Sequence, residues 1–387
     1  QTPSPAPHKD FNPTLPTLSN SSIPPGRDFG RDDFEVAILC ALPLEYSAVS
    51  YLFDEFWGDN VNQYGRAPGD PNCYTTGRMG NYNVVLVHLS MGKAAAAAAA
   101  ASVRSSYRKL QLTFLVGVCG AAPCNRGSEI LLGDVIISKT VVQHDFGWRH
   151  PHGFKRKDSV EDILGRPGRD IRNLMFLFET DRGIDRLEER TAHFLQQLQG
   201  KVAWTKRRGK YDHPGVEKDR LFKAEHRHKH HALLTCACYK CDGGSDPVCE
   251  EALTLSCTEL GCDDKFLLER QRLREIKQRM EQDDDDGALG RPAVHVGAVA
   301  SGDAVIKSAT DRDEMAKETG VIGFEMEGAG VWDAMPCIVV KGVADYADCH
   351  KNKDWQDFAA ATAASTCKAI LESYTRSDGD VVDSIAA

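Results

Sequence analysis

Three acidic residues follow apolar segments of the sequence, where carboxyl groups can act as acids, bases or stabilisers of positive charge. They are Glu45 in ALPLE, Glu327 in GFEMEGAG and Asp345 after IVVKGVA. One reaction that uses all three functions passes through a cationic sugar: it needs an acid for the leaving group, a nucleophile on the opposite face and negative groups around the hydroxyls. Glycosidases meet the same demand with two carboxyl groups, one of which stays protonated.

Each acidic residue has a role in this hypothesis and a simpler alternative. Asp345 should emerge from a strand's carboxyl end, where a low dielectric favours its protonated form, although an Asp there can also begin a turn or cap a helix. Glu327 can accept hydrogen bonds from two hydroxyl groups. Glu45 would repel phosphate and act as a base for water, unless it is a surface helix residue. Glu325 and Glu327 could also be solvated charges at a helix start, and we keep this interpretation for Glu325.

The apolar segments alternate with helical patterns, which indicates an α/β sheet with helices on its faces. Right-handed crossovers would bring the carboxyl ends of the strands to one edge, where ligand sites form in such folds. The predicted strands are 34–42, 82–89, 112–120, 133–142, 293–302 and 336–348, and the predicted helices are 44–53, 93–110, 311–320 and about 355–374.

The composition indicates a globular intracellular chain. Its 387 residues are 42% hydrophobic and 27% charged, and 47 basic against 56 acidic residues give a net charge of −9, which argues against nucleic-acid binding along the whole chain. No apolar segment approaches the length of a membrane span, and the start of the chain lacks a signal core. We expect a cytoplasmic protein whose 13 cysteines are reduced, with a disordered leader at 1–33 and a flexible tail at 376–387.

Six short segments, taken in order, resemble the purine and uridine phosphorylase superfamily. Within the superfamily, the chain is most similar to the methylthioadenosine/S-adenosylhomocysteine nucleosidase branch. The residues of its motifs most resemble those of nucleoside phosphorylase-like domains in fungal multidomain proteins. The resemblance covers residues 34–375 apart from an insertion at about 200–290. The segments are CALPLEYSAV (40–49), LSMGKAAA (89–96), VGVCGAAP (116–123), ASGDAVIKS (300–308), GFEMEGAGVWDA (323–334) and KGVADYADCHKNKDWQDFAAATAA (341–364).

The resemblance implies a three-layer α/β/α fold with a central mixed, partly barrel-like sheet. It also implies that Asp345 protonates N7 of a purine, that Glu327 holds the ribose 2′ and 3′ hydroxyls, and that Met326 packs under the sugar. In the phosphorylases an arginine near the position of Glu45 helps to bind phosphate. In the nucleosidase branch a Glu there orients the attacking water, which favours hydrolysis over phosphorolysis.

The base would lie against the segment 301–306, with Val305 and Ile306 in its wall. The family often has an aromatic residue at the position of Val305, so its absence leaves the base preference open. Cys119 and Gly120 belong to a glycine-rich turn, where the backbone can approach the base or the sugar closely. The turn at 89–96 is a weak phosphate loop, because it lacks the full Walker pattern.

The insertion is basic at first and then rich in cysteine. Lys218, Arg220, Arg227 and His228 could bind phosphates if this segment folds over the ribose 5′ side, or they could belong to a solvated linker. Cys238 and Cys241 have the spacing of half a zinc knuckle, but no second such pair follows. We therefore expect free thiols, a solvated basic loop and no metal, and structural zinc stays open as the alternative.

Together these observations predict a purine nucleosidase that hydrolyses the N-glycosidic bond of a ribonucleoside, or of a nucleotide such as ATP. The alternatives are a phosphate-dependent purine nucleoside phosphorylase and a non-catalytic purine-sensing domain of a receptor-like protein. We expect no cofactor, a small-molecule purine as partner, no nucleic acid and no membrane. A homo-oligomer is compatible with the family.

Overall fold

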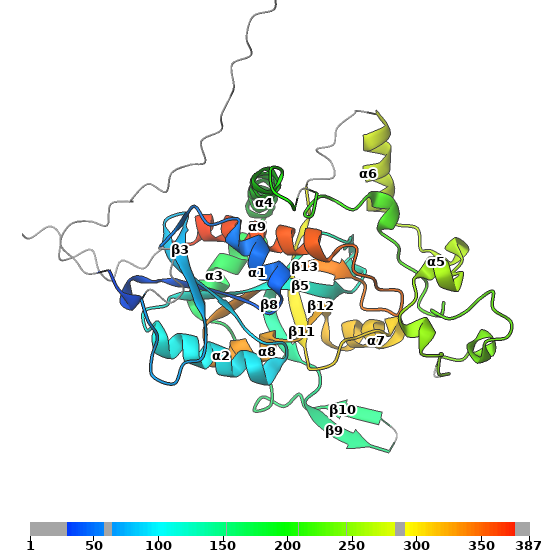
Figure 1. Cartoon of the computed structure of the whole chain (residues 1–387). Coiled ribbons are helices and arrows are strands. Elements are labelled where there is room, and N and C mark those ends of the chain that lie inside the picture. Colours follow the sequence, from blue (N-terminus) through cyan, green and yellow to red (C-terminus); the bar gives the residue numbers. More distant parts are fainter. Residues whose placement is uncertain are drawn as a thin grey trace, which may run out of the picture.

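A mixed sheet of nine strands forms the centre of the part of the chain that the structure, a computed structural model, describes (Figure 1). The described residues are 29–57, 64–151, 153–207, 209–244, 246–282 and 291–375. The strand order is β12-β11-β8-β13-β5-β1-β4-β3-β2. The strands are β1 Val36–Cys40, β2 Glu55–Phe56, β3 Tyr74–Met79, β4 Tyr82–His88, β5 Leu112–Ala121, β8 Val135–Gln143, β11 Val294–Ser301, β12 Val321–Glu325 and β13 Cys337–Asp345.

Half of this sheet closes on itself. β12 pairs with β11 in parallel and also with the end of β5 in antiparallel orientation, so that β12, β11, β8, β13 and β5 form a ring. β13 runs parallel to β5 and antiparallel to β8. The predicted mixed, partly barrel-like sheet is therefore confirmed.

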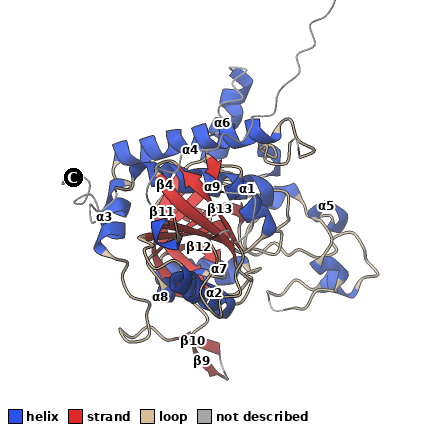
Figure 2. Ribbon diagram, turned by 60° about the vertical axis from the view of Figure 1, so that its left-hand side comes forward, coloured by secondary structure: helices blue, strands red, loops and turns tan. Residues whose placement is uncertain are grey.

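Helices cover both faces of the sheet and make the predicted three layers (Figures 1 and 2). One layer contains α1, α3, α4 and α9, and the opposite layer contains α2 and α8, with α7 beside β12. The helices are α1 Pro43–Ser50, α2 Lys93–Ser106, α3 Arg169–Leu177, α4 Asp181–Val202, α5 Cys257–Leu260, α6 Gln271–Gln282, α7 Ala309–Thr319, α8 Gly328–Ala334 and α9 Gln356–Ser373.

The central strand β1 is buried on both faces and is apolar at every position. In β1, Val36 and Ile38 face the core under α1, α4 and α9, whereas Ala37 and Leu39 face the core under α2 and α8. A strand that is buried on both faces needs a continuous apolar run, which is the pattern in the sequence.

Small residues let the helices approach closely. A side chain added at Gly330 of α8 would place its Cβ 2.1 Å from the carbonyl oxygen of Lys93 in α2, and one at Gly342 of β13 would lie 1.9 Å from the carbonyl oxygen of Ala359 in α9. The alanine-rich sequences of α2 and α9 have the same function, because short side chains allow a helix to pack closely against its neighbour.

Other segments lie outside the three layers. A hairpin of β9 (Gly147–His150) and β10 (Gly153–Arg156) extends from the body, and β6 (Cys124–Asn125) pairs with β7 (Ser128–Glu129). Between α4 and α6, the described residues form α5 and short 3-10 turns joined by irregular backbone, and α5 and α6 lie to one side of the sheet (Figure 1).

The structure describes the chain from residue 29, five residues before the predicted boundary at 34. Phe29 packs with its ring centroid 5.4 Å from Phe34 and from Tyr64 and 5.9 Å from Trp57, and residues 31–33 form a 3-10 turn. These three aromatic partners provide the burial that the polar composition of the leader seemed to lack. The rest of the predicted leader, the predicted tail and the acidic run at 283–286 lie outside the described residues.

No helix among the described residues has both the length and the apolar character that a membrane crossing would need.

Candidate active site

Glu45 lies at the start of α1, with its carboxylate turned back over the sheet. Its Oε2 accepts hydrogen bonds from the amides of Ala41 (2.9 Å) and Leu42 (2.8 Å), and its Oε1 accepts one from Val118 in β5 (2.8 Å). Only 2% of Glu45 is exposed. Gly117 makes room for it, because a Cβ at Gly117 would lie 2.3 Å from Oε1. Glu45 is therefore a buried group of the interior, not the surface helix residue of the alternative interpretation.

Burial raises the pKa of Glu45 above its ordinary value, against the lowering effects of Lys341 and of the amides that bind it. A carboxylate with a raised pKa is a stronger base than a solvated one. Glu45 is thus suited to accept a proton from water near neutral pH.

Lys341 is the centre of the buried charge cluster. It lies on β13 with its side chain 1% exposed, and its Nζ is 3.2 Å from Glu327 Oε2 and 3.4 Å from Glu325 Oε2. Burial alone would lower the pKa of this ammonium, but Glu327, Glu325 and Glu45 raise it well above its ordinary value. One buried cation thus faces three buried carboxylates.

Glu325 is not a solvated helix-start charge, so that interpretation is wrong. It is buried at the end of β12, and burial raises its pKa. Its carboxylate accepts hydrogen bonds from the amides of Glu327 (3.1 Å) and Gly328 (2.9 Å). It therefore satisfies the first turn of α8 and fixes the backbone of Glu327.

Asp345 ends β13 and lies beside the last residues of β5. Its Oδ1 accepts a hydrogen bond from the amide of Ala347 (2.9 Å), and its Oδ2 forms an ion pair with Lys351 Nζ (2.9 Å). Gly120 pairs with Asp345 in one strand and with Phe324 in another. A Cβ at Gly120 would lie 2.8 Å from Asp345 Oδ1, so this glycine makes room for the carboxylate.

The start of α2 also faces the acidic cluster. The amide of Gly92 lies 3.5 Å from Glu327 Oε1, and the amide of Lys93 donates to Asp303 (2.9 Å). The Lys93 ammonium pairs with Asp145 and Asp303. Carboxylates therefore occupy the positions at this helix N-terminus where an anion would bind.

The other predicted binding residues lie in three places. Cys119 is buried on β5. Burial raises the pKa of its thiol, the charge of Lys341 lowers it and the charge of Asp345 raises it. Met326 is half-buried in the turn between Glu325 and Glu327. The remaining two lie in the loop after β11, where Val305 is half exposed and Ile306 packs against a small apolar cluster.

The four basic residues predicted to bind phosphate have partners outside the acidic cluster. Lys218 pairs with Asp354 at 3.7 Å, and Arg220 pairs with Asp264. The guanidinium of Arg227 donates to two backbone carbonyl oxygens of the insertion. His228 lies among cysteine and histidine side chains.

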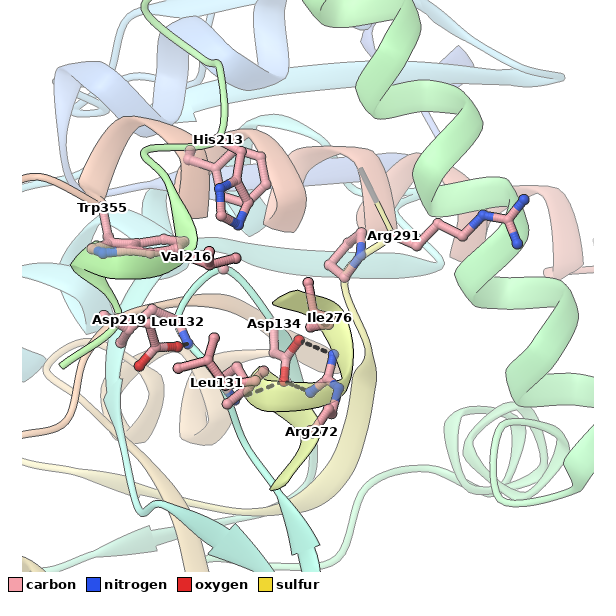
Figure 3. Close-up of a pocket in the computed structure, with 14 residues that line it drawn as sticks. Leu131, Leu132, Asp134, His213, Val216, Asp219, Arg272, Ile276, Arg291 and Trp355 are labelled. Carbon is pink, nitrogen blue, oxygen red and sulfur yellow. Dashed lines mark hydrogen bonds and ion pairs between the residues drawn. The ribbon is translucent and has the colours of Figure 1, made fainter. Parts of the chain in front are cut away.

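A pocket between the insertion and the sheet does not contain the acidic cluster (Figure 3). Its wall includes Asp134, directly before β8, and Arg272 in α6, which form a bidentate ion pair. Trp355 lies on the other side of the pocket. Burial alone would raise the pKa of Asp134, but Arg272 and His295 lower it below its ordinary range. The pocket therefore lies at the interface where α6 packs against the sheet.

The sequence reasoning missed Lys341, Lys351 and the burial of Glu325. A lysine within the apolar run IVVKGVA was an available signal for Lys341, because lysine is almost never fully buried unless it is paired. Lys351 and Glu325 gave no such signal, since charged residues that follow a strand are ordinarily solvated.

A family model described as Phosphorylase superfamily matches residues 35–191 and 264–376 of the chain. The unmatched part, 192–263, begins within α4 and overlaps the predicted insertion at about 200–290, of which the family model matches residues 264–290. The matched ranges contain all three acidic residues of the candidate site.

Among curated proteins, the chain is 28% identical over 347 residues to a nucleotide-binding leucine-rich repeat (NLR)-like protein of Hyaloscypha variabilis. The alignment covers 88% of this chain and 29% of that relative's length.

Three solved structures are similar in fold. They are the futalosine hydrolase of Helicobacter pylori (15% identity, TM-score 0.48, 88% of this chain and 98% of that one), the 5′-methylthioadenosine/S-adenosyl homocysteine nucleosidase of Helicobacter pylori (15%, 0.48, 88% and 99%) and the 5′-methylthioadenosine/S-adenosylhomocysteine nucleosidase of Neisseria meningitidis (17%, 0.48, 88% and 99%).

Proposed function

The chain belongs to the phosphorylase superfamily, and from this premise we propose that it hydrolyses the N-glycosidic bond of a purine ribonucleoside or nucleotide. The products are the free base and the sugar. Water, and not phosphate, is the second reactant. The proposed location is the cytoplasm, where thiols stay reduced.

The observation that carries this proposal is the charge of the cluster around Lys341. Three buried carboxylates, Glu45, Glu325 and Glu327, face this one ammonium. Two other lysines lie beside the site, and both are paired: Lys351 with Asp345, and Lys93 with Asp145 and Asp303. A phosphate ion would find no free cation among these described residues, whereas a cationic sugar would find excess negative charge.

The proposed reaction divides the work among three carboxyl groups. Glu45 takes a proton from water as the water oxygen forms a bond to C1 of the ribose. The electrons of the breaking C–N bond pass into the purine, which takes a proton from the carboxyl group of Asp345. In this step Asp345 is in its acid form, with its carboxyl group released from the ion pair with Lys351. Glu327 accepts hydrogen bonds from the ribose hydroxyls, and these bonds strengthen as the sugar becomes cationic.

A second candidate function is a purine-binding domain without turnover. It is favoured by the alignment to an NLR-like protein, of which this chain spans only 29%. A domain of that size within a longer chain could pass the binding of a purine on to other domains. The two candidates differ in product formation.

The test is a chromatographic screen of adenosine, methylthioadenosine, guanosine, inosine, AMP and ATP, with and without phosphate. The proposal predicts that free base is released from at least one compound and that phosphate does not increase the rate. Release that requires phosphate would instead identify a phosphorylase. Tight binding without product over long incubation would identify the binding domain.

The variant Asp345→Asn tests the proposed acid, because an amide cannot supply the proton. We expect kcat to fall by about 10²–10⁴-fold while the unfolding midpoint stays unchanged. The matched control is Asp185→Asn on the exposed face of α4, which should retain full activity. Equal activity in the two variants would remove Asp345 from the mechanism.

A further inference from the structure

Four side chains from distant parts of the sequence meet beside the insertion. They are His228, Cys257 and Cys262 from the insertion and His350 from the loop after β13, and one ligand atom of each lies within 4.8 Å of the others. The two Nδ1 atoms are 3.3 Å apart. Nδ1 of His228 lies 3.7 and 3.6 Å from the sulfurs of Cys257 and Cys262, and Nδ1 of His350 lies 3.5 and 3.8 Å from the same sulfurs.

These distances are those of a tetrahedral metal site. Zinc binds nitrogen at about 2.0–2.1 Å and sulfur at about 2.3 Å. In a tetrahedron these bond lengths place two nitrogens about 3.3 Å apart and a nitrogen and a sulfur about 3.6 Å apart. The one nitrogen–nitrogen distance and the four nitrogen–sulfur distances agree with these values within a few tenths of an ångström.

The outer nitrogens of both histidines hold them in the orientation that a metal needs. Nε2 of His228 lies 2.9 Å from the carbonyl oxygen of Leu255, and Nε2 of His350 lies 3.0 Å from that of His226. A carbonyl oxygen only accepts, so each Nε2 carries the proton and each Nδ1 turns a lone pair toward the cluster. Ligating histidines in metalloproteins have this outer bond as a rule.

A second cluster of histidine and cysteine side chains lies within the insertion. His230, Cys236 and Cys249 have ligand atoms within 4.8 Å of one another. The sulfur of Cys238 lies 3.4 Å from that of Cys236 and 3.7 Å from that of Cys249. Nε2 of His230 is buried without a hydrogen-bond partner in the described residues. Cys238 is not in the group of mutually close atoms that contains His230, so a Cys₃His set closes when this sulfur and the His230 imidazole approach each other.

The insertion has little regular secondary structure. Between α4 and α6 its described residues form α5, short 3-10 turns and one isolated bridge between Phe222 and Leu267. Some of its apolar side chains are buried, such as Tyr211 and Leu260, and a bound metal would add to this burial against the entropy cost of ordering the irregular backbone. Structural zinc supplies that stabilisation directly in small irregular domains.

We propose that the insertion binds two structural Zn²⁺ ions, one held by His228, Cys257, Cys262 and His350 and the other by His230, Cys236, Cys238 and Cys249. Nitrogen and thiolate sets of this geometry select zinc among the common divalent metals. This proposal replaces the expectation of free thiols without metal. It also makes His228 a metal ligand and not a phosphate contact.

The sequence alone pointed to the wrong pair of cysteines. Cys238 and Cys241 have the familiar spacing, but the sulfur of Cys241 contacts the carbonyl oxygen of Ala237 (3.7 Å) and belongs to neither cluster. His350 lies 88 residues after Cys262, so spacing could not reveal it.

The first site connects the insertion to the candidate active site. His350 is the neighbour of Lys351, which pairs with Asp345. A metal on His350 would fix this loop and thereby the position of the Asp345 carboxylate. His350 is therefore a positioning residue in this proposal, and this last step rests on the proposed function.

The test is the zinc content of the purified full-length chain, measured by mass spectrometry of the metal. We expect two equivalents of zinc per chain. His350→Ala and Cys236→Ser should each retain one equivalent, whereas the controls Cys241→Ser and Cys73→Ser should retain two. Wild-type protein with less than one equivalent, or single variants that keep both, would overturn the proposal.

X-ray absorption at the zinc edge keeps the proposal testable if a variant fails to fold, because it needs only the wild-type chain. We expect a first shell of mixed sulfur at about 2.3 Å and nitrogen at about 2.0–2.1 Å. A shell without sulfur would contradict both sites.

Turnover separates the two sites, provided that the chain is a hydrolase. His350→Ala should lower kcat more than Cys236→Ser, although each loses one zinc ion. Equal kcat values would refute the positioning role of the first site. Metal content does not depend on turnover, so an inactive chain with two zinc ions would refute the proposed function alone.

Discussion

At the scale of single residues, the candidate site depends on the unequal environments of its carboxyl groups. Glu45 is held by three backbone amides in the interior, whereas Asp345 is held by one amide and one lysine. Environments that differ in this way let chemically similar groups take different roles in one reaction.

The raised pKa of Glu45 gives a pH dependence with a definite sign. Water activation needs the ionised carboxylate, so kcat/KM should fall as the pH decreases through the pKa of Glu45. Because burial raises this pKa, the fall should begin at a higher pH than for a Glu with the ordinary value of 4.5. The measurement is the pH profile of kcat/KM. A profile that is flat down to the ordinary Glu range would contradict the role of Glu45.

Residue types alone predicted part of this site. The apolar strands placed Glu45 and Asp345 at strand ends, because the carboxyl ends of parallel strands meet at one edge. The burial of Glu325 and Lys341 could not be predicted from the sequence in the same way, because each is buried only together with the other. A lysine is tolerated in the interior when its ammonium is paired and hydrogen-bonded.

At the scale of elements, close packing between α2 and α8 positions both Gly92 and Glu327. The two helices touch at Gly330, where a Cβ would lie 2.1 Å from a backbone oxygen of α2. The strand–helix order was predictable where a strand has a continuous apolar run, as in β1, whereas β3 (YTTGRM) has none and was not predicted. The closure of the sheet through β12 was not, because the short segment VIGFE carries no separate signal for pairing with β5.

Gly330→Ala should destabilise the protein by about 1–3 kcal/mol, because backbone atoms of α2 cannot move as a flexible side chain would. The matched control is Gly200→Ala in α4, where no atom lies within 4 Å of the added Cβ. This change should stabilise the helix by up to about 1 kcal/mol. Denaturant unfolding of the two variants measures both effects, and equal changes in the free energy of unfolding would refute the packing argument.

At the scale of the whole molecule, ion pairs connect the insertion to the sheet. Arg272 of α6 forms its bidentate ion pair with Asp134, which His295 also contacts at 3.1 Å. Asp134 is 2% exposed, so removal of its main partner would leave a buried charge without compensation.

Arg272→Met should lower the free energy of unfolding by about 3–5 kcal/mol at neutral pH. The lowered pKa of Asp134 gives the pH dependence: the stabilisation exists above the ordinary Asp value of 3.8 and is lost as the pH falls through the folded-state pKa. The difference between wild type and variant should therefore shrink in acid. Arg274→Met, at an exposed position of the same helix, is the control and should change stability by less than about 0.5 kcal/mol.

The most direct test of the central claim follows the oxygen atom that reaches the sugar. The reaction is run in water labelled with heavy oxygen, with phosphate present, and the mass of the released ribose product is measured. Hydrolysis through Glu45 predicts that the label appears on C1 of the sugar and that no phosphate ester forms. An unlabelled ribose 1-phosphate would contradict the claim.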